Sequence, residues 1–175
     1  MRLRTGAVAC VMVAVAGCTP AGEGTAPTPE PSETPEETEA EPSPEEAALL
    51  AYESMWGVLV EESRNSHPDY SELEQYAQGD ALELVEHGVG AEAEEGVVAQ
   101  GEPVFSPDVV SAEDTRVEIE DCMDSTGWLR VDIESGELVE PSPEEPIFRQ
   151  IDAGVSFDGL TWRVSELRIW EIGSC

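Results

Sequence analysis

The sequence predicts an α+β domain in which helices come first and an antiparallel sheet follows. Over residues 44–90, apolar residues recur every three or four positions, which is the helical period. After Gly96 the period falls to two, as in strands with one buried face. An acidic, proline-rich stretch precedes the helices, so the domain is expected to span residues 44–175. Helices followed by strands, rather than alternating with them, favour the α+β class.

The chain begins with Arg2 and Arg4, and an apolar run over residues 6–16 follows. This run has the length of a signal-peptide core and falls short of the roughly 20 apolar residues that span a bilayer. Val15-Ala16-Gly17-Cys18 resembles the bacterial lipobox. The resemblance implies that residues 1–17 are a lipoprotein signal peptide and that Cys18 receives acyl chains such as palmitate. An ordinary signal peptide is the alternative.

Residues 18–43 are expected to form a disordered linker between the lipid and the domain. From Thr19 to Ser43 there is no aromatic residue, no Val, Ile or Leu, and no basic residue. Such a segment buries too little apolar area to offset its chain entropy, and its prolines and like charges favour extended conformations. An adhesive acidic tail or an O-glycosylated stalk is the alternative to a plain spacer.

The helical part begins at a strong start signal, Ser43-Pro44-Glu45-Glu46, with an N-cap serine, proline at N1 and glutamate at N3. This first helix is expected to run to about Arg64. A second capping box, Ser71 with Glu74, predicts a short helix, and Asp80 with Glu83 predicts a third. The apolar stripe expected on the first helix is Ala48, Ala51, Tyr52, Met55, Val58 and Leu59, with Trp56 beside it.

The strand part ends in a long hairpin around Asp158-Gly159, a dipeptide typical of tight hairpin turns. Its second strand changes apolar parity, which predicts a β-bulge near Glu166. Extended segments are expected at residues 97–99, 103–110, 116–123, 128–133, 147–157 and 160–172.

This order of elements is similar to the NTF2-like fold, a cystatin-related cone, and within it to small secreted actinobacterial lipoproteins, most of them uncharacterised. The resemblance covers residues 45–175 and implies a pocket between helices and sheet. It implies no particular activity. The short blocks that carry it are Ala51-Tyr52, Trp56, Tyr76-Ala77, Gly79 to Leu82, Gly101 to Pro103, Asp121 to Asp124, Trp128, and Trp162 to Cys175.

Four cysteines are present, and two of them remain after the leader and the lipid site are assigned. Cys10 lies in the leader and Cys18 is the lipidation site. Cys122 and Cys175 are then an even pair in an exported domain, where disulfides form readily. We expect a disulfide between them. A reactive or metal-binding thiol is the alternative, although no C-x-x-C spacing occurs.

The formal net charge is −31, and all eight basic residues are arginine. Nucleic acid is therefore not expected as a partner, because binding to phosphates needs a basic surface. Acidic residues such as Glu118, Glu120 and Asp121 are expected on a solvated surface. No stretch matches a calcium-binding loop, and His67 and His87 lack metal-ligand spacing, so neither a metal nor a cofactor is expected.

No catalytic motif occurs, so candidate functional residues come from the expected pocket. They are Tyr52, Trp56, Tyr76 and Trp128, with Asp124 as a possible polar group. Tyr52 and Trp56 are one helical turn apart, so both can face one space. The same aromatics can equally be simple core.

These observations favour a non-catalytic domain held on the extracytoplasmic face of the cell membrane, binding a small apolar ligand or an envelope protein. Two alternatives remain open. One is a pocket enzyme of the ketosteroid-isomerase or dehydratase kind, and the other is an accessory module of cell-envelope machinery. A shared fold does not by itself decide among them.

Overall fold

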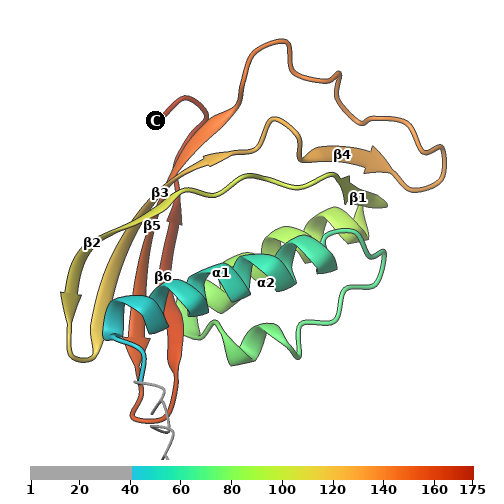
Figure 1. Cartoon of the computed structure of the whole chain (residues 1–175). Helices are drawn as coiled ribbons and strands as arrows, with labels where there is room; N and C mark the ends of the chain where they lie inside the picture. The colour runs from blue at the N-terminus through green and yellow to red at the C-terminus, as the bar shows by residue number, and fades with distance from the viewer. Residues whose placement is uncertain (1–40) are drawn as a thin grey trace, which may run out of the picture. The chain divides into compact units, whose positions relative to one another are not determined.

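The computed structural model describes residues 41–175 (Figure 1). The leader, Cys18 and the linker up to residue 40 lie outside the described residues. The elements in chain order are α1 (Pro44–Glu62), η1 (Leu73–Gln75), α2 (Gly79–Glu94), β1 (Val97–Gln100), β2 (Pro107–Glu113), β3 (Arg116–Asp124), β4 (Leu129–Asp132), β5 (Phe148–Phe157) and β6 (Trp162–Ile169).

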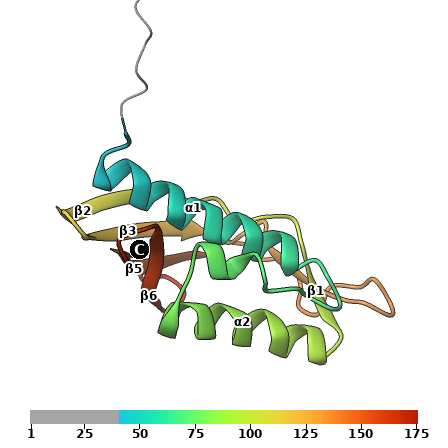
Figure 2. The same ribbon diagram turned by 90° about the horizontal axis from the view of Figure 1, so that it is seen from below.

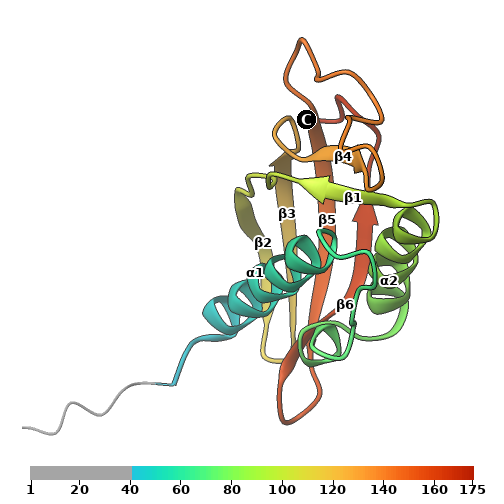
Figure 3. The ribbon, with the colours of Figure 1, turned by 90° about the vertical axis from the view of Figure 1, so that its right-hand side faces the viewer.

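The described strands form two antiparallel sheets. Four strands in the order β2-β3-β5-β6 make the main sheet, and β1 pairs with β4 in a smaller one. The main sheet is curved, and both helices lie on the same face of it (Figures 1 and 2). The β1–β4 pair crosses one end of this layer (Figure 3). The α+β class with helices on a curved antiparallel sheet is confirmed.

Helix α1 starts at the predicted capping box. The Glu46 amide donates to Ser43 Oγ, and the Ser43 amide donates to Glu46 Oε2. Pro44 has no N–H, so this helix start leaves three amides without intrahelical partners, and these bonds satisfy two of them. The buried face differs from the predicted stripe, because it includes Trp56, which is only 2% exposed, and Val60, whereas Val58 is half-buried.

The predicted second helix is wrong, because only the 3-10 turn η1 forms there. The Ser71 amide donates to Asp69 Oδ1, and such local side-chain bonds compete with helix formation. Two residues after η1 the chain is already extended beside β6. The Gln78 amide donates to the Val164 carbonyl, and the Val164 amide donates to the Tyr76 carbonyl. Pairing with the sheet thus replaces the helix.

Helix α2 begins one residue before the predicted cap, at Gly79, whose φ of +56° suits glycine. It continues through Gly88 and Gly90 to Glu94. Gly90 has a packing role, since a Cβ there would lie 3.1 Å from the Tyr70 hydroxyl. Helix α2 therefore keeps Gly90, which helix propensity disfavours, because the contact with Tyr70 needs the space.

One face of the main sheet supplies half of the core. Alternate residues of β3 and β5 point towards the helices, and β3–β5 pairing puts them side by side. The inward pairs, in order along the sheet, are Val117 with Val155, Ile119 with Ala153, Asp121 with Ile151, and Met123 with Arg149. Two charged residues, Asp121 and Arg149, thus occupy positions in an otherwise apolar pair of rows.

The hairpin of β5 and β6 forms as predicted, with Gly159 at φ +96°. Gly154 pairs with Glu166 while Val155 pairs with Val164, so Ser165 is the extra residue of a bulge. The predicted bulge near Glu166 is therefore present. It lets Val164, Leu167 and Ile169 all pair with inward residues of β5, although their spacing is irregular.

Cys122 and Cys175 are joined by a disulfide, with their Cα atoms 5.9 Å apart. The C-terminal tail is also bound along β5. The Gln150 amide donates to Ser174 Oγ and the Gly173 amide donates to the Phe148 carbonyl, each at 2.8 Å. The bridge thus fastens a tail that already pairs with the sheet.

Replacing both Cys122 and Cys175 by serine is expected to lower the free energy of unfolding. The bridge closes a loop with a sequence separation of 53, which in the chain-entropy model corresponds to about 4 kcal/mol. Urea unfolding of the double variant and of the oxidised parent measures the difference. Reducing the parent with dithiothreitol should lower its stability to that of the double variant. Two free thiols in the folded, unreduced parent would contradict the assignment.

Candidate ligand-binding cavity

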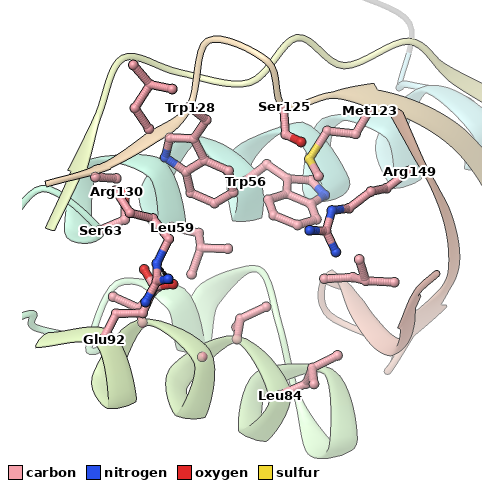
Figure 4. Close-up of a pocket in the computed structure, with 16 residues that line it drawn as sticks. Trp56, Leu59, Ser63, Leu84, Glu92, Met123, Ser125, Trp128, Arg130 and Arg149 are labelled. Atoms are coloured by element: carbon pink, nitrogen blue, oxygen red, sulfur yellow. Dashed lines mark ion pairs between the residues drawn. The ribbon is translucent and has the colours of Figure 1, made fainter. Parts of the chain in front are cut away.

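A cavity of about 320 Å³ lies between the two helices, the end of the main sheet and the β1–β4 pair (Figure 4). Its size is at the lower end of the range for small-molecule sites, about 300–1,000 Å³. Its wall is mostly apolar. The lining residues are Trp56, Leu59, Ser63, Leu84, Val85, Gly88, Val89, Glu92, Ala99, Met123, Ser125, Trp128, Leu129, Arg130, Arg149 and Ile169.

The cavity exists because α1 and α2 pack mainly on strands rather than on each other. Gly88 contributes to the opening, since a Cβ built on it meets nothing within 4 Å. Gly88 shares a helical face with Leu84 and Glu92, four residues to either side, and all three line the cavity. A side chain at position 88 would therefore lie over this space.

Two tryptophans form the aromatic part of the wall (Figure 4). Trp56 is held by Phe105, whose ring centroid is 4.9 Å away, and by an edge contact with Tyr52 at 6.3 Å. The indole nitrogens of Trp56 and Trp128 are enclosed, and neither has a hydrogen-bond partner within residues 41–175. An enclosed N–H donor without an acceptor costs free energy, about 1–3 kcal/mol.

Two arginines and one glutamate provide the charge of the wall. Arg130 Nε lies 2.9 Å from Glu92 Oε1, so these two charges offset each other. Arg149 enters from the inward row of β5, and its guanidinium points into the cavity (Figure 4). Within residues 41–175, Arg149 has neither an ion pair nor a side-chain hydrogen bond. The cavity is therefore locally positive in a strongly acidic chain.

The structure brings Trp56 and Trp128 together but not the other candidates. Tyr52 is fully buried beneath the cavity region and does not line it. Tyr76 does not line it either, because its backbone pairs with Val164 on β6. The Asp124 carboxylate accepts hydrogen bonds from Thr126 in the following turn, so it too lies outside the lining.

Asp121, which the sequence analysis places on a solvated surface, is buried at 3% exposure. The Tyr52 hydroxyl donates to its Oδ2 and the Ser106 amide donates to its Oδ1, each at 2.8 Å. Burial raises the pKa of Asp121 above its ordinary value, although both hydrogen bonds oppose that shift. Burial and the neighbouring carboxylate also raise the pKa of Tyr52. This pair joins α1 to β3 and does not face the cavity.

Within residues 41–175, no cluster of three or more His, Cys, Asp or Glu side chains has the geometry to hold a metal ion. His87 lies in a shallow surface depression on α2 among Glu83, Glu86 and Glu94. Each helix of the described part is too short or too polar to cross a bilayer.

The sequence analysis missed Arg149, although a signal was present. Ile151, Ala153 and Val155 alternate along β5, and Arg149 has the same parity, so it occupies an inward position. A charged residue in phase with a buried row has either a partner or a function. The same reasoning applied to Val117, Ile119 and Met123 would have identified Asp121 as inward-facing.

No family model matches the chain, and no curated protein matches it. The fold is similar to the crystal structure of the intermembrane space region of the chloroplast protein ARC6. The TM-score is 0.50 and the identity 16%, over 71% of this chain and 96% of that one. At this identity the likeness concerns the fold alone.

Tyr52→Phe is expected to lower the free energy of unfolding by about 1–3 kcal/mol at pH 7, because it leaves a buried carboxylate oxygen unpaired. The pKa of the Asp121 carboxyl is higher in the folded protein than in the unfolded chain. Such a group stabilises the folded protein at pH values below its pKa in the unfolded chain, and this stabilisation is lost as the pH rises through its pKa in the folded protein. Removing the hydroxyl raises the pKa of Asp121 further, so the loss should be larger at pH 7 than at pH 4.

Urea unfolding at both pH values measures this difference. Tyr76→Phe is the matched control, since the Tyr76 hydroxyl makes no hydrogen bond to another side chain or to the backbone within residues 41–175. Its effect should be small and independent of pH. An equal loss for Tyr52→Phe at pH 4 and pH 7 would show that the hydroxyl does not act through the Asp121 charge.

Proposed function

We propose that this protein is a lipid-anchored extracytoplasmic lipoprotein whose NTF2-like domain binds a small, largely apolar ligand without catalysing a reaction. The observation that carries the binding part is the cavity between α1, α2 and the sheet. It has the size and the apolar lining of a small-molecule site, with a few polar groups at defined positions.

The NTF2-like assignment is supported by the order of elements and by where the cavity lies. Helices precede a curved antiparallel sheet, and the final pair of strands is its longest hairpin. The cavity opens between helices and sheet, where a cone-like fold holds its ligand.

The membrane part of the proposal is supported by the sequence. Val15-Ala16-Gly17-Cys18 follows a basic start and a short apolar run, as in lipoprotein leaders. The acidic linker would hold the domain away from the lipid. The Cys122–Cys175 bridge suits an oxidising compartment outside the cytoplasm.

Binding is proposed rather than catalysis because of the titratable groups at the cavity. An isomerase or dehydratase needs a general base that can reach a proton of the substrate. Glu92 is the carboxylate in the lining, and it is paired with Arg130. Asp121 has the raised pKa of a candidate base, but it is bound by Tyr52 and Ser106 away from the cavity.

The cavity predicts binding of a neutral apolar probe. N-phenyl-1-naphthylamine, titrated into the chain from Thr19 to Cys175, should gain fluorescence saturably. Gly88→Leu should weaken this binding by about tenfold or more, roughly 1.4 kcal/mol, because the new side chain lies over the cavity.

Gly57→Leu is the matched control for Gly88→Leu. Gly57 is also in a helix with nothing within 4 Å of its Cβ position, but it is exposed on α1 and does not line the cavity. Both variants gain helix propensity, about 1 kcal/mol each, so only cavity access separates them. Equal probe binding by both variants, or no saturable binding by the parent, would count against a ligand cavity.

The lipobox predicts that Cys18→Ser prevents acylation. In cells fed labelled palmitate, the parent should carry label and sediment with membranes, whereas the variant should carry none and be released. Cys10→Ser, which changes the other leader-region cysteine, should behave as the parent does. A Cys18→Ser variant that stays with membranes after salt washing would disprove the lipid anchor.

A further inference from the structure

We propose that the ligand of this cavity is an apolar molecule with a carboxylate head, and that Arg149 binds that head. The inference rests on the proposed function, since it names the chemical class of ligand for the same cavity. Three observations carry it: the placement of Arg149, the pairing of the other arginines, and the kind of polar groups left unpaired in the wall.

The first observation is the position of Arg149 in the sheet. It pairs with Met123 across β3 and β5, so both side chains lie on the face that packs against the helices. Met123 is 3% exposed, and Arg149 is half-buried. A half-buried guanidinium on an apolar face loses part of its hydration, and an anion that binds it replaces the lost hydrogen bonds.

The second observation is that Arg149 differs from the other arginines of the described part. Of the eight arginines, six lie in residues 41–175. Four of these six form ion pairs with Glu or Asp side chains, and Arg168 lies 3.4 Å above the ring centroid of Trp170. In a chain of net charge −31, Arg149 is thus the cavity-lining cation that no acidic side chain of the described part neutralises, and an external anion would complement it.

The third observation is that the unpaired side-chain groups in the wall are donors. The indole N–H groups of Trp56 and Trp128 lack acceptors within residues 41–175. The hydroxyls of Ser63 and Ser125 already donate to the carbonyls of Val60 and Ile147. Both indole nitrogens are enclosed by protein atoms, so the unpaired donor that the wall offers to a ligand is the Arg149 guanidinium (Figure 4). A complementary ligand therefore brings acceptor oxygens and negative charge to Arg149.

The remaining wall determines the body of the ligand. Leu59, Val85, Val89 and Met123 are buried, and Trp56 and Trp128 add aromatic faces. At about 320 Å³ the space suits one short acyl chain or a small ring system rather than a long lipid. A carboxylate matches the planar guanidinium and can accept two parallel hydrogen bonds from it.

The test compares decanoate with methyl decanoate, which has the same chain and a neutral head. Both are titrated by calorimetry at pH 7 into the chain from Thr19 to Cys175. The parent should bind decanoate about 10- to 100-fold more tightly than the ester, because a hydrogen bond to a charged group contributes about 1.5–3 kcal/mol. Arg149→Gln should abolish this preference, because it should weaken decanoate binding about 10- to 100-fold more than ester binding.

Two further variants separate the charge of Arg149 from a general effect. Arg149→Lys should retain part of the preference, since it keeps the charge but not the two-bonded geometry. Arg168→Gln removes the same charge from an exposed position outside the cavity and should bind both probes as the parent does. The indole N–H signals of Trp56 and Trp128 should shift on adding decanoate, while those of Trp162 and Trp170 stay.

The two proposals fail differently. Equal affinity of the parent for decanoate and ester, or a preference that survives Arg149→Gln, overturns the carboxylate inference and leaves the cavity function intact. Failure of decanoate, the ester and the naphthylamine probe to bind overturns the ligand-binding function itself. Tighter binding of decyltrimethylammonium than of decanoate would assign a cationic ligand and overturn the inference as well.

Discussion

The rest of the domain depends on the contact between α1 and the inward row of β3. Tyr52 reaches across this contact, and its hydroxyl donates to Asp121, which also accepts the Ser106 amide. This bond acts with the apolar packing of α1 on the sheet to set the rotation and position of the helix. Trp56 lies one helical turn further on, about 6 Å along the axis, so the same bond places its ring at the cavity.

Asp121 and Arg149 show how similar placements can have different consequences. Asp121 interrupts the apolar inward row of β3, and Arg149 interrupts that of β5. Arg149 lies two residues along β5 from Ile151, the strand partner of Asp121. Asp121 is enclosed and its two oxygens have donors, so its role is structural. Arg149 faces a space and has no partner among the described side chains. A charge that the fold satisfies stabilises it, whereas a charge that the fold leaves unsatisfied is available to a ligand.

The small sheet turns this arrangement into a cavity. Without β1 and β4, the ends of both helices and the ends of β3 and β5 would face solvent. The paired strands β1 and β4 instead cross that end (Figure 3), and their residues Ala99, Leu129 and Arg130 line the cavity. Arg130 then pairs with Glu92 of α2, which ties the small sheet to the helix layer. The cavity is thus bounded by elements far apart in the chain.

The sequence by itself determined the α+β class, the start of α1, the strands β3, β5 and β6 of the main sheet, the final hairpin with its bulge, and the cysteine pair. These features depend on local signals: a capping box, a change of period from 3.6 to 2, an Asp-Gly turn, and an even cysteine count. The segment expected at residues 103–110 overlaps only the first half of β2. The expected helix at residues 71–77 was wrong because pairing with Val164 of β6 outweighed a local capping signal. Tyr52 and Tyr76 do not line the cavity for a related reason. Periodicity gives the buried face of an element but not which residues of other elements lie opposite that face.

Only the tertiary structure decided which buried side chains meet a cavity and which meet each other. Tyr52 and Trp56 share one helical face, yet one is bonded to Asp121, 69 positions away, and the other lines the cavity. Arg149 of β5 lines the same cavity as Trp56, because strand pairing places Arg149 beside Met123. Local spacing fixes which way a side chain points along its own element. The partner it meets depends on how separate elements pack, and that packing is set by contacts between residues distant in the chain.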